Sequence, residues 1–166
     1  MPTNFERAFA ERPDVYAAWA GLNASIKANM DLRRYELATL AAAQRLRSSY
    51  CCLAHGKVLA EQFDAPVAEI VADRRSAGLD DVDLAVMELA ERVVDDASSI
   101  GEDDLRPLRE LGLSDAEIMD VVLAAAARCF FSKTLDALGV QPDAHFAELP
   151  QELLDALVVG RPIAAA

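Results

Sequence analysis

The chain has 166 residues, 53% of them hydrophobic, so it can bury a sizeable core, and these values exclude global disorder. Its net charge of −12 argues against nucleic acids and anionic membrane surfaces as partners, because proteins that bind them carry basic faces. Residues 1–14 are charged and lack the apolar segment of a secretory signal, and the three cysteines are an odd number, so we expect a cytoplasmic protein.

Three helices are predicted in the first part of the chain, where apolar residues recur at helical spacing. The first begins at Asp14 and the second at Asp31. The third covers about residues 50–63, after Ser48 and Ser49, which are suitable N-cap residues. The first helix is expected to bury one apolar stripe: Val15, Trp19, Leu22, Ile26 and Met30.

Five further helices are predicted toward the C-terminus. Ser114 and Glu117 form the capping-box pattern that opens the most apolar of them, and Gly139 suits its end. Residues 98–101 and 141–150 are predicted loops. The expected positions of the five helices are 66–78, a helix from Asp80 that buries Val82, Val86, Leu89 and Val93, about 104–111, 114–139 and 151–158.

These patterns predict an all-α protein, because no stretch shows the alternation of a β-strand. No long linker divides the chain, so residues 1–166 are predicted to form a single domain. Its parts are a motif region at 31–63, packing helices at 64–139 and a C-terminal helix at 151–158.

Cys51, His55 and Glu36 form the constellation that points to chemistry. Cys51 falls in the first turn of the third helix, where unpaired N–H groups and the helix dipole stabilise a thiolate. His55 follows four residues later on the same face, within reach to take the thiol proton directly or through a water. Glu36 lies on the preceding helix and can orient the imidazole if the two helices pack as a hairpin. From spacing alone, a buried structural cysteine beside an unrelated histidine is the more common arrangement.

A resemblance favours the catalytic interpretation. Glu36 is followed by eleven residues, then Ser48, two more residues, Cys51 and, after three residues, His55. This resembles the redox branch of the alkylhydroperoxidase-D and carboxymuconolactone decarboxylase superfamily, which carries Glu, eleven residues and Cys-x-x-Cys-x-x-x-His. The resemblance covers roughly residues 31–139. It implies an alkylhydroperoxidase-D-like helical array that reduces hydroperoxides through Cys51, His55 and Glu36 without a cofactor, assembled as a trimer or hexamer.

Ser48 departs from this pattern, because it stands where the first cysteine is expected. A serine cannot form a disulfide, so the resemblance implies oxidation of Cys51 to a sulfenic acid that an external thiol resolves. Ser48 is instead expected to donate a hydrogen bond to the Cys51 thiolate. Tyr50 is expected to wall the pocket.

The two other cysteines are poor candidates for the resolving thiol. Cys52 is adjacent to Cys51, and a bridge between neighbours in a helix requires a strained ring. Cys129 lies in the most apolar helix and is predicted to be a buried residue that packs in the core. A metal site is not expected either, because the chain has two histidines and no metal-ligand spacing.

Two alternatives to a peroxidase stay open. One is a cofactor-free lyase resembling the decarboxylase branch, in which Glu36 and His55 transfer protons and the sulfur is incidental. The other is a non-catalytic helical relative that lost its activity with the first cysteine.

Overall fold

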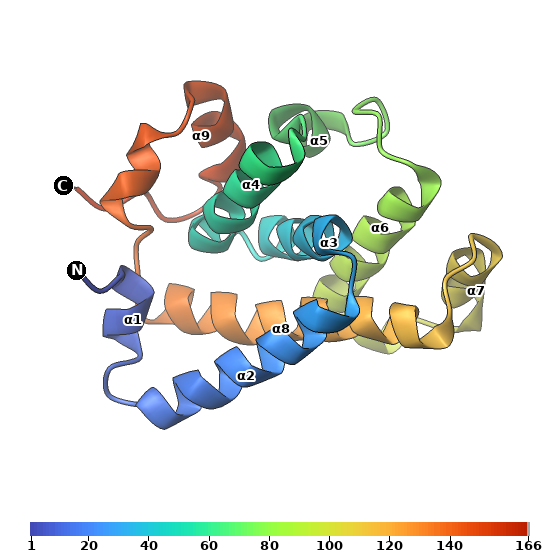
Figure 1. Cartoon of the computed structure of the whole chain (residues 1–166), viewed down its shortest axis with the longest axis horizontal. Helices are drawn as coiled ribbons and strands as arrows, with labels where there is room; N and C mark the ends of the chain where they lie inside the picture. Colours follow the sequence, from blue (N-terminus) through green and yellow to red (C-terminus); the bar gives the residue numbers. More distant parts are fainter. Residues whose placement is uncertain (166) are drawn as a thin grey trace.

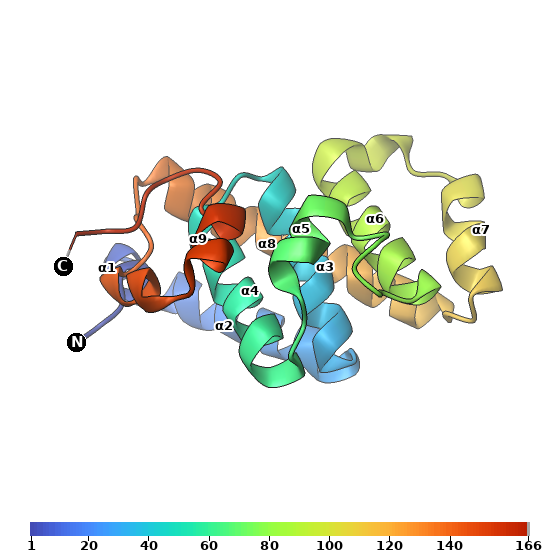
Figure 2. The ribbon, with the colours of Figure 1, turned by 90° about the horizontal axis from the view of Figure 1, so that it is seen from above.

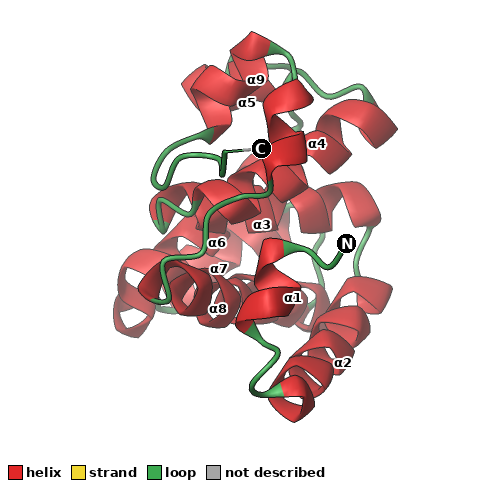
Figure 3. Ribbon diagram, turned by 90° about the vertical axis from the view of Figure 1, so that its left-hand side faces the viewer, coloured by secondary structure: helices red, strands yellow, loops and turns green. Residues whose placement is uncertain are grey.

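Helices account for every regular element of the computed structural model, which describes residues 1–165 (Figure 3). The all-α prediction is therefore confirmed for that part of the chain. The central element is α3 (Leu32–Arg45), which begins at Asp31, whose carboxylate accepts a hydrogen bond from the Arg34 N–H. Residues 35–43 of α3 are all buried.

Three helices surround α3: α4 (Ser49–Phe63), α6 (Asp81–Asp96) and α8 (Asp115–Ala137). The small side chains of residues 41–43 let these neighbours approach α3 closely. The buried carboxylate of Asp83 on α6 accepts hydrogen bonds from Arg33 and Arg34 on α3 and so ties the two helices together. Figure 1 shows α3 between α4 on one side and α8 on the other.

The longest helix, α8, begins as the sequence predicts. Ser114 and Glu117 form the capping box, and Gly139 follows the helix end with a φ of 75°. Its neighbour α2 (Pro13–Asn29) lies along it (Figure 1). The stripe predicted for α2 is only partly correct, because Val15 and Leu22 are 40% and 52% exposed and Ile26 is the one buried residue of this helix.

The shorter helices complete the fold. The helix predicted for residues 66–78 ends early, as α5 (Val67–Asp73), while α7 (Glu102–Glu110) and α9 (Gln151–Leu157) match their predictions within two residues. Three short elements were not predicted, because each is five residues or fewer: α1 (Asn4–Ala8), and the 3-10 turns η1 (Ala97–Ser99) and η2 (Ala144–Glu148). Seen from above, α4, α5 and α9 form a layer over α3 (Figure 2).

The main hydrophobic core is a single cluster of residues from α3, α4, α5, α6, α8 and α9. A smaller cluster joins α2, α3 and α8 and consists of Ile26, Tyr35, Ala124 and Ala127. Aromatic rings close the main core near the chain termini, and Trp19 stacks on Phe131 with 4.0 Å between ring centroids. Within residues 1–165, no helix combines the length and apolar character that a membrane span requires.

Candidate active site

The turn between α3 and α4 positions Cys51. Arg47 ends α3 in the left-handed conformation, with φ 55°, and the Ser48 N–H donates to the Ala43 carbonyl at 3.0 Å. The chain then enters α4, so Cys51 lies in the first turn of that helix, as predicted. The C-terminal segment holds this turn, because the Gly160 N–H donates to the Ser49 hydroxyl at 2.8 Å.

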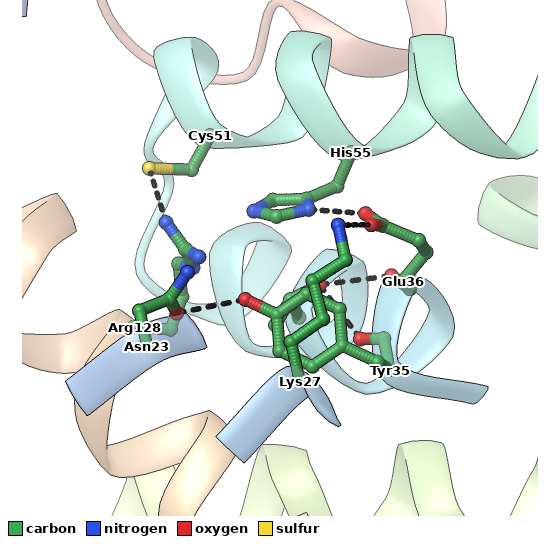
Figure 4. Close-up of polar contacts among 8 residues, drawn as sticks. Asn23, Lys27, Tyr35, Glu36, Cys51, His55 and Arg128 are labelled. Carbon is green, nitrogen blue, oxygen red and sulfur yellow. Dashed lines mark hydrogen bonds and ion pairs between the residues drawn. The ribbon is translucent and has the colours of Figure 1, made fainter. Parts of the chain in front are cut away.

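Glu36 and His55 face each other across the α3–α4 hairpin. The His55 Nδ1 lies 2.5 Å from Glu36 Oε2, and the Lys27 Nζ lies 2.9 Å from Glu36 Oε1 (Figure 4). The Glu36 side chain is 1% exposed, and each of its carboxylate oxygens has a partner. The carboxylate thus joins α2, α3 and α4.

The protonation states of this pair follow from burial and charge. Burial and the nearby Arg128 cation lower the pKa of His55 to about 4, although Glu36 favours the protonated ring. Burial raises the pKa of Glu36, but the hydrogen bonds of His55 and Lys27 and the charge of the Lys27 ammonium outweigh it, so the pKa is lowered. At neutral pH Glu36 is therefore a carboxylate and His55 a neutral imidazole. The Nδ1 hydrogen points at Glu36, which leaves Nε2 with a free lone pair.

The Cys51 sulfur is enclosed but has polar neighbours. It is 1% exposed, and its two polar contacts come from α8: the Ser132 hydroxyl at 3.1 Å and the Arg128 Nη1 at 3.5 Å. Figure 4 shows the His55 ring between the Cys51–Arg128 pair and Glu36, with one ring edge toward each. A sulfur, a cation and a base backed by a carboxylate therefore share one enclosed site.

Asn23 and Lys27 of α2 cover the site, where both contact Tyr35 of α3. The Tyr35 hydroxyl donates to Asn23 Oδ1 at 2.8 Å, and the Tyr35 ring meets the His55 ring edge-on at 6.1 Å (Figure 4). The Lys27 ammonium lies 5.2 Å from the centre of the Tyr35 ring. Polar contacts from α2 thus close the site on the side of His55.

Two solved structures share this arrangement of helices. The alkylhydroperoxidase AhpD core of an uncharacterized peroxidase-related protein from Ralstonia eutropha JMP134 superposes with a TM-score of 0.79 at 21% identity, covering 87% of this chain and 78% of that one. The chain has the alkylhydroperoxidase AhpD fold. An uncharacterized peroxidase-related protein from Silicibacter sp. TM1040 gives a TM-score of 0.78 at 19% identity, covering 85% of this chain and 76% of that one.

Comparison with known sequences gives no match for this AhpD-fold chain. No family model matches it, and no curated protein does. The structural matches therefore assign the fold alone.

In the AhpD fold Ser48 does not donate the hydrogen bond to Cys51 that the sequence predicts. Its hydroxyl is buried without a hydrogen-bond partner, and Ser132 donates to Cys51 instead. Ser48 is the N-cap residue of α4, with φ −94° and ψ 93°, and its side chain makes no cap hydrogen bond either.

Tyr50 faces a different part of the AhpD fold from the sulfur. Its hydroxyl hydrogen-bonds the Asp143 carboxylate, and its ring meets those of Phe5 and Phe146 edge-on. Burial and Asp143 raise the pKa of Tyr50. Tyr50 thus ties α4 to α1 and η2.

The two other cysteines are poorly suited to resolve an oxidised Cys51. All three cysteines are free in the structure. Cys52 is fully buried, and burial raises its pKa well above the ordinary value. Cys129 is half-buried, and burial raises its pKa as well. Among residues 1–165, no group of three or more His, Cys, Asp or Glu side chains is placed to hold a metal ion.

Sequence reasoning missed the α8 contribution to this AhpD-fold site, although a signal was present. Arg128 lies on the buried stripe of α8, at helical spacing from apolar residues on both sides. A charged residue at a core-facing position is rare unless it is paired. The apolar members of this stripe include Ile118, Val121, Ala124, Ala125, Phe131 and Leu135.

Proposed function

We propose that the chain is a thiol peroxidase that reduces a small hydroperoxide through Cys51. The observation that supports this most directly is the site itself, where the Cys51 sulfur and a Glu36-backed His55 lie in one enclosed cluster. A nucleophile, a base and a group that orients the base are the parts that covalent thiol catalysis requires. The AhpD fold, shared with two peroxidase-related proteins, agrees with this proposal.

The proposed reaction oxidises the sulfur by two electrons. The Cys51 sulfur attacks the terminal oxygen of the hydroperoxide ROOH, so that an S–O bond forms while the O–O bond breaks. The thiol proton passes through the free Nε2 of His55 to the departing oxygen, which leaves as the alcohol ROH. The products are a Cys51 sulfenic acid and ROH, and the charge of the site is unchanged. Glu36 stabilises the transient imidazolium.

An external thiol completes the proposed cycle, because Ser48 cannot form a disulfide. A first thiol condenses with the sulfenic acid, releasing water and leaving a mixed disulfide on Cys51. A second thiol attacks that disulfide, regenerates Cys51 and leaves as the oxidised dimer. A thiol-based reductant fits the reducing cytoplasm that we propose as the compartment.

Hydroperoxide turnover with dithiothreitol as the external thiol tests this proposal. We expect Cys51→Ser to abolish turnover and Cys129→Ser to retain it, with circular dichroism confirming that both variants are folded. His55→Ala is expected to lower kcat by roughly 10²–10⁴-fold, the usual contribution of a general acid or base. Undiminished turnover in Cys51→Ser would overturn the proposal. An inert Cys51 together with no turnover would favour the non-catalytic alternative.

The Glu36–His55 pair by itself supports a second candidate. A neutral imidazole held by a buried carboxylate is a general base that needs no sulfur, as a cofactor-free lyase of the decarboxylase type requires. Such an enzyme acts on a lactone or a carboxylate. It stays active as Cys51→Ser and loses activity as His55→Ala, so the same two variants separate the candidates.

We also propose that the chain forms a homo-oligomer, a trimer or a hexamer. A groove of about 450 Å³ runs between α2 and α8, and it is almost entirely apolar. Large exposed side chains line it, and an oligomer can bury such a surface. These side chains are Val15, Leu22, Leu123 and Phe130. Light scattering tests the proposal: a monomer at micromolar concentration would contradict it.

A further inference from the structure

Arg128 is a buried cation without a carboxylate partner. It is 4% exposed, and none of the carboxylates in residues 1–165 lies within ion-pair distance of its guanidinium. Burial lowers the pKa of Arg128, but Cys51 and Tyr35 more than offset this, so the pKa is raised. The Arg128 Nε has no hydrogen-bond partner. The Phe131 ring, 5.7 Å away, is a further stabilising contact.

Such a charge requires an anion nearby. A guanidinium does not lose its proton in proteins, so Arg128 cannot escape the cost of burial by becoming neutral. A buried charge is strongly unfavourable unless a counter-charge compensates for it. The closest carboxylate of the cluster, Glu36, already has His55 and Lys27 as partners. Two groups that can carry a negative charge face the guanidinium, the Cys51 sulfur and the Tyr35 hydroxyl. The Tyr35 hydroxyl keeps its proton to donate to Asn23, so the sulfur is the group left to carry the charge.

We propose that Arg128 is a further catalytic residue, which holds Cys51 as a thiolate in the resting protein and pairs with the sulfenate after oxidation. This inference rests on the proposed peroxidase function and changes its starting state. The thiol proton has already left before the hydroperoxide arrives. His55 is neutral in this state, because a second positive charge beside the Arg128 cation is unfavourable. The guanidinium takes the role of a fixed counter-ion in the low-dielectric interior, where such a pair is strongest.

The balance of the first step changes accordingly. The thiolate attacks the terminal oxygen of ROOH, the S–O bond forms and the O–O bond breaks, which gives the sulfenic acid and RO⁻. The proton of the transferred hydroxyl then passes through His55 Nε2 to RO⁻. The products are ROH and a Cys51 sulfenate, which remains paired with Arg128. The single negative charge is conserved throughout, and the sulfur has lost two electrons.

Ser132 provides the matched control, because it contacts the same sulfur without a charge. Its hydroxyl lies 3.1 Å from Sγ, closer than the Arg128 Nη1 at 3.5 Å. If a hydrogen bond alone stabilised the thiolate, Ser132→Ala would matter more than Arg128→Met. If the charge of Arg128 stabilises the thiolate, Arg128→Met matters more than Ser132→Ala. Other titratable groups surround the pair on α2, α3, α4 and α8: Lys27, Tyr35, Glu36, Cys52, His55 and Asp136.

The test is an ultraviolet titration of the thiolate in a protein whose single thiol is Cys51. The background substitutions are Cys52→Ala and Cys129→Ser, and absorbance requires no reagent to reach the enclosed sulfur. We expect a thiolate band at neutral pH that Cys51→Ser removes. Arg128→Met is expected to lower the ratio of thiolate to thiol at neutral pH by about tenfold or more, since one pKa unit corresponds to a tenfold change in that ratio. Arg128→Lys is expected to retain most of the band, and Ser132→Ala to change it less than Arg128→Met.

A double-mutant cycle followed by thermal unfolding tests the inference even if Arg128→Met folds poorly. Cys51→Ser leaves the cation unpaired, so we expect it to lower the midpoint, whereas adding Arg128→Met to Cys51→Ser restores part of that loss. Additive effects, or a thiolate band that Arg128→Met leaves unchanged, would overturn the inference. Peroxide turnover is scored separately. An Arg128-dependent thiolate without turnover contradicts the proposed function alone, and turnover without that dependence contradicts this inference alone.

Discussion

Replacing His55 by asparagine is expected to remove most of the fall in the free energy of unfolding that the titration of His55 causes at mildly acidic pH. Asparagine keeps an N–H that can donate to Glu36 but has no ring to titrate. In the folded protein the pKa of His55 is lowered to about 4, against an ordinary value of 6.5. The unfolded chain therefore binds more protons between these two values, and stability must fall as the pH drops from about 6.5 toward 4.

The size of the effect follows from the width of that window. Each pH unit contributes about 1.4 kcal/mol, so the full window is on the order of 3 kcal/mol, and the fall from about pH 7.5 to about pH 5 is on the order of 2 kcal/mol. Stopping near pH 5 keeps Glu36 ionised, because its pKa is lowered in the folded protein. Surface carboxylates titrate equally in both proteins and cancel in the difference.

Urea unfolding followed by circular dichroism measures this difference directly. The wild type is expected to lose about 2 kcal/mol more free energy of unfolding than His55→Asn between the two pH values. His145→Asn is the control, because His145 is the one other histidine and is exposed, and it should behave like the wild type. Equal pH dependence in the wild type and His55→Asn would refute a neutral, buried imidazole.

Three further predictions test the parts that hold the site together. Ser48→Cys restores the two-cysteine spacing, so one equivalent of hydroperoxide should yield a disulfide to Cys51, seen as a loss of two thiols by mass spectrometry; two intact thiols would contradict it. Lys27→Met should cost less than about 1 kcal/mol in urea unfolding, because the Lys27 side chain is 42% exposed and solvent screens its charge, and a loss above about 3 kcal/mol would contradict this. Gly160→Ala should destabilise the fold by about 1–3 kcal/mol, because its Cβ would overlap the Arg47 carbonyl oxygen, and an unchanged thermal midpoint would contradict that packing.

The parts of the fold that depend on local signals were predictable from the sequence. The cap at Asp31 and the capping box of Ser114 and Glu117 mark helix starts that the structure confirms. The Cys51-to-His55 spacing likewise places both side chains on one helix, since one turn separates residues i and i+4.

The parts that depend on tertiary packing were not predictable from the same signals. An apolar stripe shows that a helix has an apolar face but not what covers it, which is why Val15 and Leu22 were expected to be buried. In the sequence Arg128 directly follows the apolar run of residues 121–127, although it lies on the buried stripe of α8. Its contact with Cys51 joins residues 77 positions apart, which local periodicity cannot show.

In the proposed function, Cys51 is the sulfur that a hydroperoxide oxidises. The most direct measurement is peptide mass spectrometry after one equivalent of hydroperoxide, with dimedone present to trap sulfenic acid at each cysteine. We expect a dimedone adduct at Cys51 and none at Cys52 or Cys129. An adduct confined to Cys129, or no adduct at any cysteine while all three remain reduced, would contradict it.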